Sequence, residues 1–168
     1  MPPALLDQRL AFPDVTMANQ DGLVAVGGDL SIERLLLAYR SGIFPWSANP
    51  ISWWSPDPRG IFDLDNLHMP RRLAQIIRRQ PYEVTRNRCF RAVMEGCAAP
   101  AARRGKTWIS REFIAAYTAL HEAGHAQSVE CWRGGELVGG IYGVSVGGLF
   151  AGESMFHRAD HASKIRSE

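Results

Sequence analysis

The sequence predicts an α+β protein in which helices are followed by an antiparallel β-meander. Three segments between residues 70 and 124 have apolar residues at helical spacing, and three β-like segments separated by glycine pairs follow, up to residue 156. Helices and strands that are segregated along the chain are typical of α+β folds. A stretch rich in Gly, Pro and Trp precedes them, and we expect it to form a small N-terminal domain.

The N-terminal stretch contains one clear helix, from Ser31 to Arg40. Ser31 is a typical N-cap residue, leucine and tyrosine side chains recur on one face, and Gly42 can end the helix. Around it we expect mostly turns, because prolines stiffen this stretch and tryptophans can fill a small lobe without long regular elements. We place a domain boundary near Ile61, which gives domains at residues 1–61 and 62–168.

A basic amphipathic helix is expected at residues 70–80. Pro70 suits a first helical turn, apolar residues recur three and four positions apart, and Pro81 forces the end. The other faces carry Arg71, Arg72, Arg78 and Arg79. These arginines form either a surface for the phosphate backbone of a nucleic acid or an ordinary solvated face.

The rest of the larger domain is expected to contain more helices and four strands. A short strand is expected at residues 82–85, a helix at 90–97, and a helix that Ser110 caps, with Ile114, Tyr117 and Leu120 toward the core. Strands at residues 127–133, 136–146 and 149–156 then turn at glycine pairs.

Composition limits the function classes. A formal net charge of +2 is too small for bulk attraction to nucleic acid, so a basic face has to be local. The sequence has no long apolar run and no signal-peptide pattern, which predicts a cytoplasmic protein without a membrane partner. Three cysteines without C-x-x-C spacing argue against a disulfide framework, and the histidine pairs lack an H-E-x-x-H pattern. We therefore expect no metal.

Glu153 is the catalytic candidate that residue chemistry singles out. It lies between a glycine and apolar residues in a β-like stretch, where small residues let a ligand approach closely. A partly desolvated carboxylate there can orient an amine or accept its proton. The alternative is a strand glutamate that simply faces water.

Five sequence blocks follow one another in a recognisable order. They are Gly22–Ser31, Ala38–Trp46, Trp53–Arg59, Thr107–Ile109 and Leu137–Lys164. In order and approximate spacing they resemble the leucyl/phenylalanyl-tRNA–protein transferase family, over nearly the whole chain from about Phe12. The resemblance implies an enzyme that moves Leu, Phe or Met from aminoacyl-tRNA to the α-amine of proteins beginning with Lys or Arg, marking them for N-degron degradation.

The resemblance also implies roles for individual residues. Glu153 matches the family's active-site glutamate, and Trp46 and Trp108 match the tryptophans of its aminoacyl-adenosine site, where a base can stack on an indole. Ile141 and Phe150 match positions that line the family's apolar pocket for the donor side chain. The implied fold of the larger domain is N-acetyltransferase-like (GNAT), in which a further helix is expected to begin near Asp160. The implied reaction needs no metal and no organic cofactor.

The family uses a D-x-Q motif downstream of the glutamate, and this sequence has no matching residues there. We therefore expect an incomplete acyltransferase domain that lacks the family's C-terminal portion. Two alternatives to a competent transferase stay open: a truncated fragment that binds the tRNA end without catalysis, and an acyl-CoA N-acetyltransferase. Against the latter, no glycine-rich turn after Phe156 could hold a pyrophosphate at a helix N-terminus.

Overall fold

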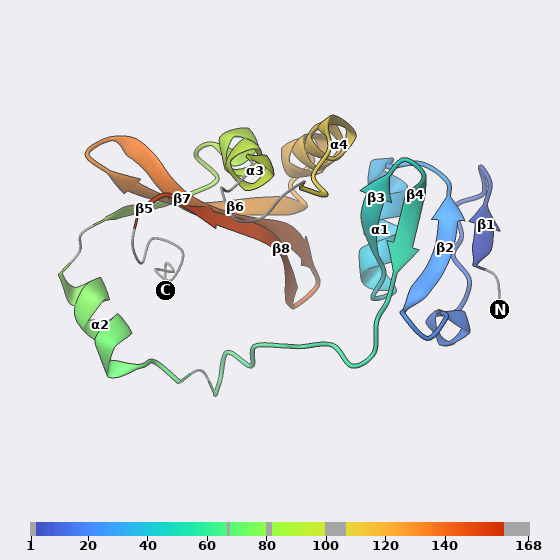
Figure 1. The fold of residues 1–168 in the computed structure, drawn as a ribbon, viewed down its shortest axis with the longest axis horizontal. Helices are drawn as coiled ribbons and strands as arrows, with labels where there is room; N and C mark the ends of the chain where they lie inside the picture. Colours follow the sequence, from blue (N-terminus) through green and yellow to red (C-terminus); the bar gives the residue numbers. More distant parts are fainter. Residues whose placement is uncertain (1–2, 67, 80–81, 100–106, 160–168) are drawn as a thin grey trace.

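The computed structural model describes residues 3–66, 68–79, 82–99 and 107–159, without the side chains of Arg72, Leu73 and Ile76. It contains two four-stranded sheets with helices packed against them (Figure 1). The helices are α1 (Ile32–Arg40), α2 (Arg71–Arg78), α3 (Phe90–Ala98) and α4 (Arg111–Glu122), with a short 3-10 turn, η1 (Val15–Met17). The helix expected near Asp160 lies outside the described residues. The fold is thus mixed α and β, as predicted.

The N-terminal region forms a sheet, so the expectation that it is mostly turns is wrong. Its strands are β1 (Ala4–Leu6), β2 (Leu23–Gly27), β4 (Ile51–Trp54) and β3 (Phe44–Ala48), in that spatial order. The strands are short, and β3 contains Pro45 because an edge position does not need its missing N–H. Trp53 is fully buried on the inner strand β4, and its indole N–H donates to the Gly27 carbonyl at 2.9 Å.

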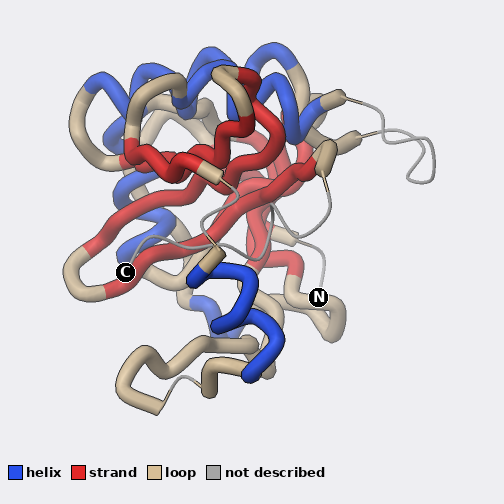
Figure 2. Tube along the Cα trace, turned by 90° about the vertical axis from the view of Figure 1, so that its left-hand side faces the viewer, coloured by secondary structure: helices blue, strands red, loops and turns tan. Residues whose placement is uncertain are grey.

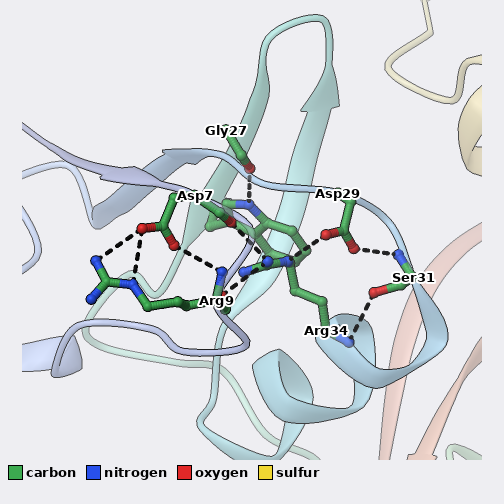
Figure 3. Close-up of polar contacts among 7 residues, drawn as sticks. Asp7, Arg9, Gly27, Asp29, Ser31 and Arg34 are labelled. Carbon is green, nitrogen blue, oxygen red and sulfur yellow. Dashed lines mark hydrogen bonds and ion pairs between the residues drawn. The ribbon is translucent and has the colours of Figure 1, made fainter.

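Helix α1 begins as predicted and fixes the chain that precedes it. The Ser31 hydroxyl accepts from the backbone N–H of Arg34 at 3.4 Å, which caps the helix. The buried Arg34 guanidinium donates to the carbonyls of Asp7 and Arg9, at 3.0 and 3.1 Å, and pairs with Asp29 at 3.2 Å (Figure 3). These contacts tie the loop after β1 to α1.

The C-terminal sheet confirms the predicted meander. Its strands are β5 (Glu83–Arg86), β6 (Ala126–Arg133), β7 (Glu136–Val146) and β8 (Leu149–His157). They lie in sequence order, and every neighbouring pair is antiparallel. Figures 1 and 2 both place α3 and α4 above this sheet and α2 below it. The sheet therefore has a helix-covered face and an outer face, and α2 lies on the side of the outer face.

Helix α3 lies very close to the sheet because of one small residue. A Cβ at Gly96 would come within 2.6 Å of the Phe156 ring, which is buried on β8. Only glycine allows this approach without displacing the ring. The contact fixes the height of α3 above β7 and β8.

One continuous core joins both regions of the chain. Buried residues of the N-terminal sheet and α1 belong to the same hydrophobic cluster as buried residues of α3, α4, β7 and β8. In α4, which Ser110 caps as predicted, Phe113, Tyr117 and Leu120 are fully buried, whereas Ile114 is half-buried. The segment between β4 and α2 runs extended along one side of the molecule (Figure 1). Helix α1 therefore brings N-terminal side chains against the C-terminal sheet.

Candidate active site

Glu153 occupies a β-bulge in β8. In the pairing of β7 with β8, Tyr142 lies opposite Ser154 and Gly143 lies opposite Gly152, so Glu153 is an extra residue between the two pairs. A bulge redirects side chains that simple alternation would place on opposite faces. Ser154 reaches Cys97 of α3 on the helix-covered face, and Glu153 reaches Tyr39 of α1. The bulge thus turns two successive side chains toward the helices.

Three buried tyrosines interact with the Glu153 carboxyl group through a hydrogen bond or through its charge. They are Tyr39 of α1, Tyr117 of α4 and Tyr142 of β7. The Tyr39 and Tyr117 hydroxyls lie 2.5 Å apart, and Tyr39 also hydrogen-bonds to Glu153. The Tyr117 and Tyr142 rings meet edge to face with centroids 5.9 Å apart. We call Glu153 and these three residues the tyrosine–glutamate cluster.

The electrostatics of the cluster suit proton exchange near neutral pH. Burial raises the pKa of the Glu153 carboxyl to about 7, although the Tyr39 hydrogen bond and the positive charge of Arg59 oppose the rise. Burial, and then the nearby acidic groups, raise the pKa of all three tyrosines. The phenols therefore stay protonated while Glu153 can gain or lose a proton.

Arg59 is the cation that approaches the cluster. It is exposed on the segment after β4, its Nη1 donates to the Gly42 carbonyl at 3.3 Å, and its guanidinium lies 4.9 Å from the centre of the Phe44 ring. These contacts hold a positive charge beside the carboxyl group, where it lowers the pKa of Glu153. The N-terminal region thus supplies both a hydrogen bond and a charge to a residue of the C-terminal sheet.

The two candidate stacking residues have different surroundings. Trp46 on β3 is 50% exposed and contacts the rings of Phe44 and Trp54, with centroids 5.9 and 5.8 Å away. Trp108 is half-buried and meets Phe113 edge to face at 5.3 Å. Because Phe113 contacts Tyr117, Trp108 lies one ring away from the tyrosine–glutamate cluster. Trp108 is therefore linked to this cluster through Phe113, while Trp46 has the more accessible ring.

Ile141 and Phe150 lie together on the outer face of the C-terminal sheet. A Cβ at Gly143 would come within 2.6 Å of the Phe150 ring, and one at Gly152 would lie 3.7 Å from Ile141 Cδ1. Gly143 neighbours Tyr142 along β7, so its Cβ direction is opposite to the tyrosine's. The glycines thus form the floor of an apolar patch that faces away from α3 and α4. Glu153 lies at β8, the outermost strand of this sheet within the described residues, so the two faces meet beside it.

The basic helix forms where it was predicted. Arg71, Arg78 and Arg79 are exposed, and α2 lies on the side of the sheet that carries Ile141 and Phe150 (Figures 1 and 2). The Arg72 side chain lies outside the described part of the structure. The described arginine side chains of this basic helix are therefore exposed, and the helix lies on the side of the apolar patch.

Most of the tyrosine–glutamate cluster is not predicted from the sequence. Tyr39 and Tyr117 were assigned only to the apolar faces of their helices, and Tyr142 and Arg59 were not singled out. The available signal was chemical: a buried phenol needs a partner for its hydroxyl, so tyrosines on two core-facing helix stripes indicate a polar group between them. The bulge that supplies this group has no signature in the residue pattern.

A second buried carboxylate has a structural role. Glu130 of β6 is fully buried and accepts from the hydroxyls of Ser128 and Thr85, both at 2.6 Å. It also accepts from the backbone N–H groups of Arg88 and Cys89, at 3.3 and 3.5 Å, at the start of α3. Negative charge at a helix N-terminus is favourable, so Glu130 anchors α3 on the sheet.

The side chains and helices of the described residues limit the kinds of site. No group of three or more His, Cys, Asp or Glu side chains in the described ranges could hold a metal ion. No described helix is both long and apolar enough to cross a membrane.

The fold and the cluster define a class of protein: a mixed α/β protein with a buried carboxyl group whose pKa is raised to about 7. Comparison with known proteins gives the particular family. The family model described as leucyl/phenylalanyl-tRNA protein transferase matches residues 61–166, and the model of that family's N-terminal domain matches residues 28–57. The chain therefore belongs to the leucyl/phenylalanyl-tRNA–protein transferase family, which confirms the resemblance seen in the sequence.

Individual relatives carry the same name. A leucyl/phenylalanyl-tRNA–protein transferase of Nitratidesulfovibrio vulgaris (strain DP4) is 56% identical over 164 residues, which is 96% of this chain and 70% of the relative. Those of Pseudomonas fluorescens (strain SBW25) and Cellvibrio japonicus (strain Ueda107) are 54% and 52% identical. The alignments cover 93% and 98% of this chain, and 71% and 72% of the relatives.

Proposed function

We propose that this chain transfers an amino acid from aminoacyl-tRNA to the α-amine of a protein, and that Glu153 is the catalytic proton acceptor. The observation that carries the proposal is the tyrosine–glutamate cluster, in which burial holds the pKa of a strand carboxyl at about 7. A general base works best when its pKa lies near the working pH. Membership of the family supplies the reaction class.

The proposed reaction is aminolysis of an ester. The α-ammonium group of the acceptor releases one proton to water, and the resulting amine nitrogen forms a bond to the carbonyl carbon of the aminoacyl ester while the Glu153 carboxylate takes a second proton from that nitrogen. The bond from that carbon to the ribose oxygen breaks, and the leaving oxygen takes a proton from the Glu153 carboxylic acid. The ester is already activated, so the site has to position two substrates and provide this proton path.

The donor would be held by three groups of residues. Trp46 and Trp108 stack with the terminal adenosine, with each stacked base worth about 1–3 kcal/mol. The patch of Ile141 and Phe150 receives the side chain of Leu, Phe or Met and rejects charged side chains through the cost of desolvation. The arginines of α2 meet the tRNA phosphates without reading sequence. The location of α2 on the side of the apolar patch supports a donor that spans both.

Finer features of the family complete the proposal. We infer acceptors that begin with Lys or Arg, a cytoplasmic location, a boundary near Ile61 between the two domains, and a GNAT-like larger domain. The antiparallel meander with helices over one face supports the last of these.

A transfer assay tests the proposal. Labelled phenylalanine is followed from charged tRNA to peptides that begin with Lys or Arg, using the chain, its Glu153→Gln variant and a Glu136→Gln control. Glu136 is an exposed carboxylate at the start of β7, so the control removes one charge from the same sheet. We expect the Glu153→Gln variant to lose about 10²–10⁴-fold in kcat with unchanged affinity for the tRNA.

Other outcomes separate the alternatives. Equal transfer by the Glu153→Gln variant and the unaltered chain would refute the role of Glu153. Tight binding of charged tRNA without any transfer by the unaltered chain would favour a protein that binds the tRNA end. Transfer from acetyl-CoA instead of tRNA would favour an N-acetyltransferase.

A further inference from the structure

Tyr142 has the one hydroxyl of the tyrosine–glutamate cluster without a hydrogen-bond partner. The Tyr39 and Tyr117 hydroxyls bond to each other, and Tyr39 also bonds to Glu153. The Tyr142 Oη atom is fully buried and makes no hydrogen bond to any described residue. A buried polar group without a partner costs stability, so its presence in a core needs a reason.

The ring of Tyr142 is held in one position. It meets Phe90 of α3 edge to face at 5.8 Å and Tyr117 of α4 edge to face at 5.9 Å. On β7 it lies opposite Ser154, the residue directly after the bulge. The ring is therefore held between α3 and α4, and its hydroxyl is close enough to Glu153 for the carboxyl charge to raise the pKa of Tyr142.

The Glu153 carboxylate has room for another donor. An ionised carboxylate offers about four lone-pair sites, and it can only accept hydrogen bonds. The charged and titratable groups that face the cluster are Tyr39 of α1, Arg59 after β4, Cys97 of α3, Tyr117 of α4 and Tyr142 of β7. Of the three phenols among them, Tyr39 already hydrogen-bonds to Glu153, and Tyr117 is paired with Tyr39.

We propose that Tyr142 is a positioning residue for Glu153, whose hydroxyl donates a hydrogen bond to the carboxylate once Glu153 is ionised. Ionisation makes the carboxylate a stronger acceptor. A rotation of the Glu153 side chain then brings it within reach of the Tyr142 hydroxyl. The bond favours the ionised form and orients the carboxylate for the acceptor amine. The catalytic part of this inference rests on the proposed function, whereas the hydrogen bond itself does not.

The test is the variant Tyr142→Phe, which keeps the ring and removes the hydroxyl. The titration of Glu153 is followed by carbon NMR on chain labelled at glutamate carboxyl carbons, and the signal is assigned by its loss in Glu153→Gln. Loss of a hydrogen bond to a charged group is expected to raise the titration midpoint by about 1–2 pH units. The control is Tyr82→Phe, which removes a buried hydroxyl that accepts from Arg133 at 2.6 Å at the far end of the same sheet. The control is expected to leave the midpoint unchanged.

The transfer rate gives a second readout. If the ionised form is required, kcat/KM of Tyr142→Phe falls by about 5–50-fold at the pH that is the titration midpoint of the unaltered chain, and it recovers toward the unaltered value as the pH rises about two units above that midpoint. A loss that is equal at every pH would indicate a purely structural role and would overturn the proposal. The double variant with Glu153→Gln is expected to lose no more activity than Glu153→Gln alone, because both changes act on the same proton.

Stability provides the third readout and keeps the proposal falsifiable if the chain shows no transfer. Below pH 6, Tyr142→Phe is expected to melt at the same temperature or higher, because the lost hydroxyl has no partner while Glu153 is protonated. A lower melting temperature there would show that the hydroxyl is already paired, and an unchanged Glu153 midpoint would refute the hydrogen bond. A raised Glu153 titration midpoint in Tyr142→Phe, together with transfer that Glu153→Gln does not change, would refute the proposed function but still support the hydrogen bond from Tyr142.

Discussion

The substitution Glu153→Gln should make the protein more stable at alkaline pH and leave its stability nearly unchanged at acid pH. Burial raises the pKa of the carboxyl from 4.5 to about 7 in the folded protein. Between these two values the folded protein holds a proton that the unfolded chain has released. The free energy of unfolding therefore falls as the pH rises through this window. Glutamine does not titrate, so the free energy of unfolding of the variant does not fall in this pH window.

The magnitude follows from the width of the window. A span of about 2.5 pH units at about 1.36 kcal/mol per unit gives about 3 kcal/mol, reached above pH 7. Glu153 as a residue is only half-buried, and solvent near the carboxyl reduces this value. We therefore expect Glu153→Gln to raise the free energy of unfolding by about 2 kcal/mol at pH 8.5 and by less than about 0.5 kcal/mol at pH 4.5.

Urea unfolding followed by tryptophan fluorescence at pH 4.5, 6, 7 and 8.5 measures the difference directly. The Glu136→Gln control changes an exposed carboxylate and should differ little from the unaltered chain at any of these values. The same stabilisation by Glu153→Gln at pH 4.5 and pH 8.5 would refute the reasoning, because a packing effect does not titrate. A variant that loses stability at pH 8.5 would show that the carboxylate is a net stabilising group.

Three further predictions concern packing and the donor site. Gly96→Ala should lower the free energy of unfolding by about 1–2 kcal/mol, because the overlap with the Phe156 ring outweighs the gain in helix propensity. Trp46→Ala should raise KM for the charged tRNA with little change in melting temperature, since the side chain is 50% exposed. Arg78→Glu should weaken tRNA binding and flatten its salt dependence by about one unit of slope.

Each of these predictions has a contradicting result. Gly148→Ala places a methyl group in open space, and a loss as large as that of Gly96→Ala would remove the packing explanation. A large drop in melting temperature with an unaltered KM would assign Trp46 to the core. Equal affinity for tRNA across a salt series would remove Arg78 from the donor site.

The regular elements with strong patterns could be predicted from the sequence. Ser31 and Ser110 both cap helices as expected, and the meander turns at the expected glycine pairs. These features depend on local chemistry: a hydroxyl that accepts from a backbone N–H, and glycines that permit tight turns. Local patterns therefore determined most of the C-terminal region and α1.

The N-terminal sheet could not be predicted in the same way. Its strands have three to five residues, too few for alternation to show, and Pro45 argues against a strand wherever its edge position is unknown. Strand β1 pairs in parallel with β2, from which it is separated in sequence by η1. Such pairing depends on the burial of Trp53 and on the hydrogen bond from the Arg34 guanidinium to the Asp7 carbonyl, which are tertiary contacts.

The candidate site was half predictable. Glu153 was singled out by its chemical setting, but its direction depends on the bulge, which is a property of the pairing between β7 and β8. The partners Tyr39 and Tyr117 come from two helices that are far apart in the sequence, and their meeting is decided by how α1 packs on the sheet. A carboxyl position can be found from local residues, whereas its acidity requires the assembled fold.

That dependence gives the Tyr39 contact a second consequence. Tyr39 belongs to the N-terminal region and Glu153 to the last described strand, so the proton affinity of this one carboxyl reports whether α1 is docked on the sheet. If the extended connection between β4 and α2 were cut and the halves drifted apart, Glu153 would meet water and titrate as an ordinary acid. The NMR signal of the Glu153 carboxyl carbon would then report, at any temperature or denaturant concentration, whether the N-terminal region is docked on the C-terminal sheet.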